Sequence, residues 1–229
     1  MEMIQDNDRK KLDEKAVKLI EESVKRIVAE RGRAVLAVCG GTSVSGIFEG
    51  LKKTDIPWED VHIFMVDERL VPSSHPDSNY RLAYKGFIEY LEDKEVLPQA
   101  NSYSVRLGDD DEETIEDYTE ELERCGGRYD ILLLSSGEDG HIGALYPNHS
   151  VLDDSEAFVI MHDSPKPPPN RMTMSRNLLL GSEVAVLLFY GEGKKEALMR
   201  FQDEEVSWEE CPAKLVMELP EAYVLTDIK

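Results

Sequence analysis

The chain has 229 residues, of which 47 are Asp or Glu and 26 are Lys or Arg, so its formal net charge is −21 at pH 7. This balance argues against nucleic acid or an anionic membrane as a partner, because surfaces that follow phosphates need clustered Lys and Arg. An anionic ligand must therefore meet a local pocket of positive charge.

Cysteine usage and the lack of long apolar runs favour a cytoplasmic location. Cys39, Cys125 and Cys211 lie far apart without a C-x-x-C pair, which argues against a disulfide framework or a zinc ribbon and favours a reducing cytosol. Residues 2–15 are charged and no apolar run approaches the length of a membrane span, so we expect neither a signal peptide nor a transmembrane segment. Residues 1–229 are expected to form a single domain with a substantial core.

The first predicted element is a helix over residues 13–31. Apolar residues recur there at three- and four-residue steps, and Gly32 follows, a pattern that predicts one buried face and an end at the glycine. The charged opposite face is interpreted as exposed to solvent, without a function.

A buried strand over residues 33–39 and a helix over residues 44–51 are predicted next. They are joined by four small residues, Gly40, Gly41, Thr42 and Ser43. A strand, paired glycines, hydroxyl residues and a helix can present backbone N–H groups to an anion such as phosphate. The alternative is an ordinary turn with an N-cap, because the spacing and lysine of a P-loop and the G-x-G-x-x-G of a dinucleotide fold are missing.

Three ionisable residues stand at the end of the next predicted strand, over residues 61–66. They are Asp67, Glu68 and Arg69. Charges at the point where a buried strand emerges are costly unless they are paired or used. A structural ion-pair network is therefore the alternative to a functional role.

Two helices are predicted in the middle of the chain. Asp77 or Ser78 caps the first, which continues to residue 91, and the second covers residues 109–123. We interpret the acidic residues of the second helix as a solvated face, because the spacing of a calcium loop is absent. The remaining histidines outside the predicted strands are expected at the surface or in packing: His75, His149 and His162.

The main candidate for chemistry follows a short apolar strand at residues 131–134. Small residues there give way to a carboxylate pair, Glu138 and Asp139, and then to His141, where a helix is expected to begin. Ligands of open α/β sheets bind at the carboxyl ends of the strands, and His is the most frequent acid/base residue. The alternative is a structural histidine at a tight turn.

The last third of the chain supplies two cations after stiff or glycine-rich segments. A proline-rich stretch at residues 165–170 precedes Arg171; it is predicted to be a stiff loop that holds Arg171 against a ligand, with a passive linker as the alternative. A strand over residues 184–190 leads through glycines to Lys194 and a helix, and a strand at residues 223–225 is expected to close the sheet.

These motifs, in this order, resemble the 6-phosphogluconolactonase family, which shares a superfamily with glucosamine-6-phosphate deaminase and isomerase. The resemblance covers about residues 40–194. It is carried by Asp67-Glu68-Arg69 with Val71-Pro72, His75, Ser78-Asn79-Tyr80, Gly137-Glu138-Asp139-Gly140-His141, Leu145-Tyr146-Pro147, and Pro165-Lys166-Pro167-Pro168 with Arg171 and Thr173. It implies an α/β fold, a modified Rossmann-like three-layer sandwich with a mainly parallel central sheet flanked by helices. The predicted alternation of strands and helices agrees with this fold.

Two segments depart from the family pattern. The family usually has a proline after its glycine and hydroxyl residues, where this chain has Val44. Around the histidine the family tends to Thr-Ala-Ser-Leu-Phe-Pro, whereas this chain has Ile-Gly-Ala-Leu-Tyr-Pro over residues 142–147. The first departure concerns the stiffness of the loop, and the second the way in which water is held near His141.

The resemblance implies hydrolysis of 6-phospho-D-glucono-1,5-lactone, which needs an activated water and a stabilised oxyanion. It implies His141 as the general base and Asp139 as the carboxylate that orients the imidazole. Arg69 would meet developing negative charge or the phosphate, and Asp67 would fix Arg69 or a substrate hydroxyl. These alternatives for Arg69 and Asp67 stay open at the level of sequence.

The phosphate would be held by two cations and by the loop after the first predicted strand. The resemblance assigns this role to Arg171 and Lys194 and to the loop residues Gly40, Gly41, Thr42 and Ser43. It implies no metal and no organic cofactor. A monomer or a small homo-oligomer is expected.

Other functions remain as alternatives. A serine nucleophile is disfavoured because no G-x-S-x-G elbow occurs. The related deaminase/isomerase has a glutamate where this chain has Tyr146 and an aromatic residue where it has Arg69. A non-catalytic sugar-phosphate sensor would keep Arg171 and Lys194 but would have no need of His141.

Overall fold

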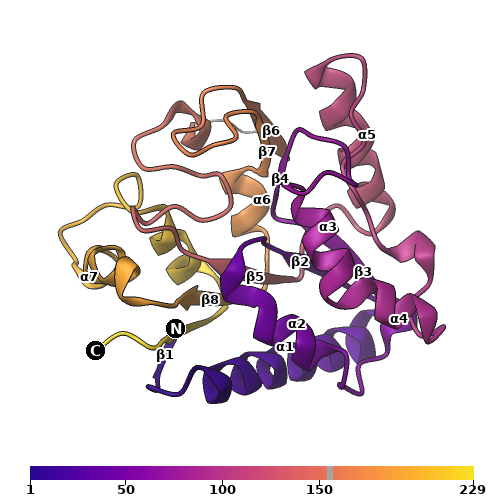
Figure 1. Ribbon diagram of the computed structural model, residues 1–229, viewed down its shortest axis with the longest axis horizontal. Coiled ribbons are helices and arrows are strands. Elements are labelled where there is room, and N and C mark those ends of the chain that lie inside the picture. The colour runs from indigo at the N-terminus through magenta and orange to yellow at the C-terminus, as the bar shows by residue number, and fades with distance from the viewer. Residues whose placement is uncertain (154–156) are drawn as a thin grey trace.

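The computed structural model describes residues 1–153 and 157–229. Its main feature is a six-stranded, entirely parallel sheet in the order β1-β9-β8-β5-β2-β3 (Figure 1). The strands are β1 (Glu2–Gln5), β2 (Ala34–Val38), β3 (Val61–Met65), β5 (Ile131–Ser135), β8 (Val184–Phe189) and β9 (Glu221–Thr226). The predicted parallel α/β fold is confirmed.

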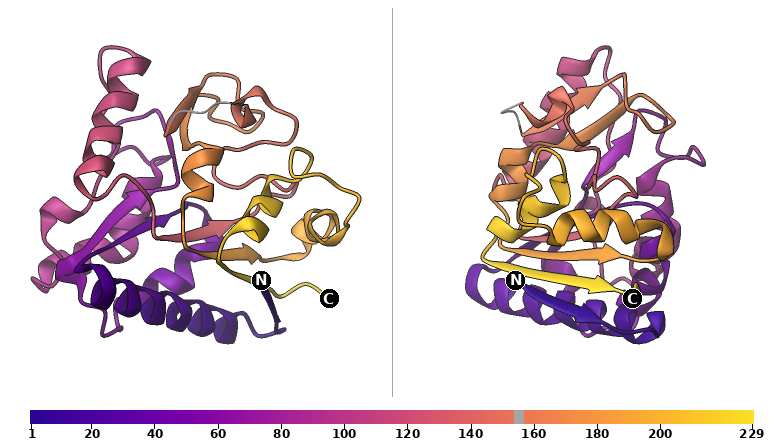
Figure 2. Two further views of the ribbon diagram at one scale, coloured as in Figure 1. Left: turned by 180° about the vertical axis from the view of Figure 1, so that it is seen from behind. Right: turned by 90° about the vertical axis from the view of Figure 1, so that its left-hand side faces the viewer.

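Helices lie on both faces of this sheet. The α-helices are α1 (Arg9–Arg31), α2 (Ser45–Leu51), α3 (Asn79–Ala83), α4 (Glu89–Asp93), α5 (Asp111–Arg124), α6 (Arg176–Leu180) and α7 (Lys195–Gln202). Figure 2 shows α1 and α2 along one face, with α6 and the 3₁₀ helix η7 (Pro212–Glu218) on the opposite side. Helix α1 ends, as predicted, at Gly32, whose φ of 77° is left-handed.

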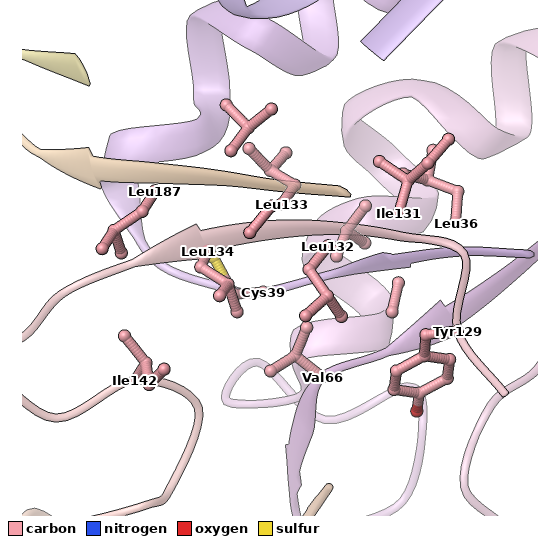
Figure 3. Packing of buried hydrophobic residues seen from close by; sticks show 14 of the residues in the cluster. Leu36, Cys39, Val66, Tyr129, Ile131, Leu132, Leu133, Leu134, Ile142 and Leu187 are labelled. Carbon is pink, nitrogen blue, oxygen red and sulfur yellow. The ribbon is translucent and has the colours of Figure 1, made fainter. Parts of the chain in front are cut away.

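The central strands are apolar on both faces because both are covered. Every residue of β2 and β8 is buried, as expected for parallel strands between two helical layers. In β5, Ile131 and Leu133 extend to one side, whereas Leu132 and Leu134 extend to the other, toward Val66 (Figure 3). This burial fixes the register of β5 and thereby the position of the loop that follows it.

A second sheet, which the sequence did not predict, lies beside the first. It has the order β4-β7-β6 and is antiparallel, with β4 (Asp67–Arg69), β7 (Arg171–Met174) and β6 (Phe158–Met161). Asp67 lies opposite Thr173 and Arg69 opposite Arg171. The charged residues after β3 are therefore a strand of their own, and this strand brings the proline-rich loop to the end of β3.

Glu68 has a structural role in this arrangement. Its buried carboxylate accepts hydrogen bonds from Ser78 Oγ (2.9 Å) and from the backbone N–H groups of Asn79 (2.7 Å) and Tyr80 (2.8 Å). Ser78, one of the two predicted caps, accepts from Arg81 N at the start of α3. The side chain of Glu68 thus satisfies donors at the first turn of a helix that would otherwise be buried without partners.

The structure corrects the expected closing strand of the sheet and describes only part of the loop expected after residue 151. β9 does not close the sheet, because the short, largely exposed strand β1 pairs with it and forms the edge. The strand expected after residue 151 is β6, and the part of the expected loop at residues 154–156 lies outside the described residues. None of the helices described in the two ranges given above has the length and apolar character of a membrane span.

Candidate active site

A cavity of about 480 Å³ opens at the carboxyl ends of β2, β3, β5 and β8. This is the edge where parallel α/β sheets bind ligands. Of the residues to which the resemblance gave a catalytic or binding role, all except Asp139 line it: Gly40, Gly41, Thr42, Ser43, Asp67, Arg69, His141, Arg171 and Lys194. Five predicted segments that are distant in sequence therefore meet at one site.

Asp139 does not line the cavity but holds His141, which does. His141 Nδ1 is 2.5 Å from Asp139 Oδ1, and the side chains of His141 and Asp139 are 18% and 32% exposed. Burial raises the pKa of Asp139, but the hydrogen bond and charge of His141 outweigh it and lower this pKa to about 2. The carboxylate stays ionised near neutral pH and fixes a proton on Nδ1, which leaves Nε2 as the basic nitrogen.

The loop that carries His141 is a tight turn, so the helix predicted at this point is wrong. Gly140 and Gly143 have φ values of 91° and 57°, and two left-handed residues so close together stop a right-handed helix. The turn is closed by Gly137 N, which donates to His141 O at 2.8 Å. Ala213 N donates to Gly140 O at 2.9 Å, which ties the turn to the start of η7.

Gly137 leaves the space in which the His141 ring lies. A Cβ at this position would stand 2.1 Å from His141 Cε1 and 2.2 Å from Nδ1. We expect Gly137→Ala to lower kcat about 100-fold, because the ring must move by about 1 Å and such a misplacement costs a factor of this size. Steady-state kinetics would test this, with Gly181→Ala as the matched control, since its Cβ would make ordinary contacts at 3.5 Å. An unchanged kcat for Gly137→Ala would contradict the expectation.

Lys194 enters the cavity from the loop after β8 and contacts two other loops. Its Nζ donates to Ser43 Oγ at 3.2 Å and to Ser135 Oγ at 2.7 Å. Burial lowers the pKa of Lys194, and the nearby Arg9 adds to this effect. A charged ammonium that is kept in such a place at a cost to stability indicates a binding role.

The loop of residues 40–43 does not contain the ordinary N-cap that was the alternative for it. No side chain caps the 3₁₀ helix η1 (Thr42–Val44) or α2 within this described segment. Gly40 is packed against Asn79, whose Oδ1 would lie 1.9 Å from a Cβ at residue 40. Asn79 Nδ2 in turn donates to Asp67 O at 2.9 Å, so Asn79 connects the loop to β4.

Asp67 and Arg171 form a buried ion pair across the two strands of the second sheet. Arg171 Nη1 lies 3.3 Å from Asp67 Oδ2, and both side chains are 6% exposed. Arg171 Nε and Nη2 donate to Pro168 O and Pro167 O, both at 3.1 Å. Asp67 therefore fixes Arg171, a partner that the sequence did not suggest, and the guanidinium keeps N–H groups beyond these three contacts.

Arg69 also lines the cavity but is held by a different segment. Its Nη1 donates to Asp77 O at 2.6 Å. Its Nε is buried and has no partner among the described residues. A buried donor of this kind is costly unless a ligand meets it.

Two cations and two tyrosines are among the lining residues that the sequence analysis did not assign to the site. They are Arg9, Tyr146, Lys166 and Tyr190. The Tyr146 ring is buried and lies 4.6 Å from that of His141, centroid to centroid. Lys166 and Tyr146 occur in the motifs that carry the family resemblance, and Tyr190 follows the apolar run of β8. Each of these three residues therefore had a feature in the sequence that could have pointed to the site. Arg9 had none, because it belongs to the charged stretch of residues 2–15, before the start of the helix predicted over residues 13–31.

The other histidines lie outside this cavity. His75 and His162 are exposed, and His149 Nε2 pairs with Asp163 Oδ1 at 3.3 Å. Within residues 1–153 and 157–229, the side chains of His, Cys, Asp and Glu form no group of three or more that could hold a metal ion.

Comparisons with known proteins, by sequence and by fold, find members of one family. Residues 7–224 match the family described as glucosamine-6-phosphate isomerases/6-phosphogluconolactonase. A 6-phosphogluconolactonase of Borreliella burgdorferi is 37% identical over 196 residues, which cover 85% of this chain and 83% of that protein.

Two solved structures share the fold at low sequence identity. The crystal structure of 6-phosphogluconolactonase from Thermotoga maritima has a TM-score of 0.87 at 21% identity and covers 100% of this chain and 99% of that chain. A monomeric glucosamine-6-phosphate deaminase has a TM-score of 0.83, also at 21% identity, and covers 99% of this chain and 97% of that chain. The fold is therefore common to both activities, and the site must distinguish between them.

Proposed function

This chain belongs to the glucosamine-6-phosphate isomerase/6-phosphogluconolactonase family, and on that premise we propose that it hydrolyses 6-phospho-D-glucono-1,5-lactone to 6-phosphogluconate, a step of the pentose phosphate pathway. The observation that carries this proposal is the His141–Asp139 pair, which shares a cavity with Lys194 on a chain of net charge −21. A basic imidazole and a local group of cations are what a phosphorylated ester requires.

In the proposed mechanism, His141 Nε2 takes a proton from a water molecule as the water oxygen attacks the lactone carbonyl. The negative charge that develops on the carbonyl oxygen is stabilised by a cation of the cavity, for which Arg69 is our candidate because of its unpartnered Nε. When the ring C–O bond breaks, the departing alkoxide takes the proton from the imidazolium. Asp139 holds the imidazole throughout and stabilises its charged form.

The phosphate is held at the other loops in this proposal. Lys194 and the loop residues 40–43 contact each other directly through Ser43 Oγ. Arg171 contributes its remaining N–H groups, positioned by Asp67 and by the carbonyls of the proline-rich loop. We propose no metal or organic cofactor for the reaction.

Tyr146 favours the lactonase over the deaminase. Its ring packs against His141 and its hydroxyl accepts a hydrogen bond from Ser164 Oγ at 3.0 Å. This phenol stands where the resemblance expects a glutamate in deaminases, and burial raises the pKa of Tyr146, so it supplies no carboxylate for moving protons between sugar carbons.

The test measures both reactions on the same protein. Freshly prepared 6-phospho-D-glucono-1,5-lactone should be hydrolysed well above its spontaneous rate, whereas glucosamine 6-phosphate should release no ammonia. Ammonia release would identify a deaminase, and hydrolysis at only the spontaneous rate, with retained binding of 6-phosphogluconate, would identify a sensor.

The same proposal extends to the organisation of the chain. We propose that residues 1–229 act as one domain, because the cavity takes residues from both sheets. A cytoplasmic location and a monomer or small homo-oligomer stay predictions.

A further inference from the structure

Arg9, the first residue of α1, reaches into the proposed active site. It lines the cavity, and its Nη2 donates to Ser43 O at 3.1 Å and to Thr42 O at 3.5 Å. These contacts anchor one corner of the guanidinium on the loop that follows β2. Among the described residues, Nε and Nη1 of Arg9 have no hydrogen-bond acceptor, so the N–H groups of these two nitrogens are left for a ligand.

The ring of Tyr190 is the platform on which this guanidinium lies. Arg9 Cζ is 4.5 Å from the ring centroid, within the range of a cation–π contact. Tyr190 is only 4% exposed and follows β8 directly, so the ring is fixed by the core of the molecule. Stacking holds the plane of the guanidinium and leaves its edges free for hydrogen bonds.

Arg9 and Lys194 bring two positive charges together, because both cations donate hydrogen bonds to Ser43. Arg9 bonds the carbonyl oxygen of Ser43, and Lys194 bonds its hydroxyl. Among the described residues, neither cation has an ion pair with a carboxylate within 4.0 Å, although 47 residues of the chain are Asp or Glu. Asp13 acts on Arg9, and Glu138 and Asp227 act on Lys194, without a direct ion pair. Two adjacent cations that repel each other and form no direct ion pair with a carboxylate are the arrangement that a dianion would satisfy.

We propose that Arg9 binds the phosphate group of the substrate together with Lys194, and that Tyr190 is the residue that positions Arg9. The ligand class is a phosphomonoester dianion. The inference rests on the proposed function for the identity of the sugar, but the binding of phosphate can be measured without turnover.

The test is the affinity of the full chain for inorganic phosphate, 6-phosphogluconate and gluconate, measured by titration calorimetry. Arg9→Gln should weaken binding of both phosphorylated species about tenfold and leave that of gluconate unchanged, because one charge-assisted contact is lost. Lys10→Gln is the matched control: it removes the same charge one residue further along, where Lys10 faces solvent and pairs with Glu14 at 3.8 Å. Equal affinities of Arg9→Gln and wild type for phosphate, or no binding of phosphate to the wild type, would overturn the proposal.

The positioning role of Tyr190 has its own readout. Tyr190→Leu should weaken phosphate binding as much as Arg9→Gln, whereas Tyr190→Phe, which keeps the ring, should restore it. An equal loss in both variants would contradict a platform role. Failure of the lactonase assignment is separate, because it would appear as absent hydrolysis by a wild type whose phosphate affinity still depends on Arg9.

Discussion

His141→Ala is expected to lower kcat by about 10² to 10⁴-fold, the range that one general base contributes, and to leave the affinity for 6-phosphogluconate within about twofold of wild type. The imidazole acts on water at the reacting carbon, and the hydrogen bonds around Lys194 do not involve it. Steady-state kinetics on fresh lactone, together with calorimetric binding, separate the two effects.

The controls for this prediction come from the same chain. His162→Ala removes an imidazole that is exposed and bonded to Asp111 Oδ2 at 2.7 Å, and it should leave kcat unchanged. The kcat of Asp139→Asn should lie between those of the wild type and His141→Ala, because the asparagine keeps the shape of the carboxylate but loses the charge that holds His141 Nδ1–H. A variant lacking His141 that turns over normally would mean that another group activates the water.

Lys194→Met is expected to raise KM for the lactone by roughly 10 to 100-fold with a much smaller change in kcat, because the loss of a charge-assisted contact to phosphate weakens binding before and during the reaction alike. Its free energy of unfolding should fall by no more than about 1 kcal/mol. Burial lowers the pKa of Lys194, so the folded state disfavours this ammonium, and removing the charge compensates for the two lost hydrogen bonds.

Lys195→Met is the matched control, since it removes the ammonium of the next residue, which is exposed at the start of α7. Its KM should remain at the wild-type value. If both lysine variants behaved alike, the effect would be one of general charge on a strongly acidic protein. If Lys194→Met instead lost kcat and kept KM, Lys194 would serve the reacting carbonyl.

The parallel sheet and its site were predictable because the two follow from the same pattern. Strands such as β5 and β8 are continuous apolar runs, which identifies them as covered on both faces. Parallel strands end at a common edge, so the residues that follow each run must meet there. The common edge of the sheet therefore predicts that Ser43, His141 and Lys194 lie at one site, even though their contacts cannot be derived from the sequence.

The strands β4 and β1 and the position of Arg9 could not be predicted from the sequence, and each has a physical reason. β4 consists of three charged residues, Asp67–Arg69, whose strand conformation depends on pairing with β7 far along the chain. β1 is short and has no fully buried residue, because it is an edge strand with one partner, so it lacks the apolar run that identifies the central strands. Arg9 belongs to a helix whose periodicity indicates only which side is buried, and its approach to the ring of Tyr190 is a property of the tertiary structure.

The position of β8 between β5 and β9 has a bearing on how the chain reaches its native state. Lys194 can meet Ser43 only after β8 has docked beside β5, and such pairings between distant segments form slowly. A phosphorylated ligand added during refolding would bind after that docking and would stabilise only molecules that have completed it. The time course of ligand capture would therefore report the final assembly of the sheet, separately from the earlier appearance of helical signal.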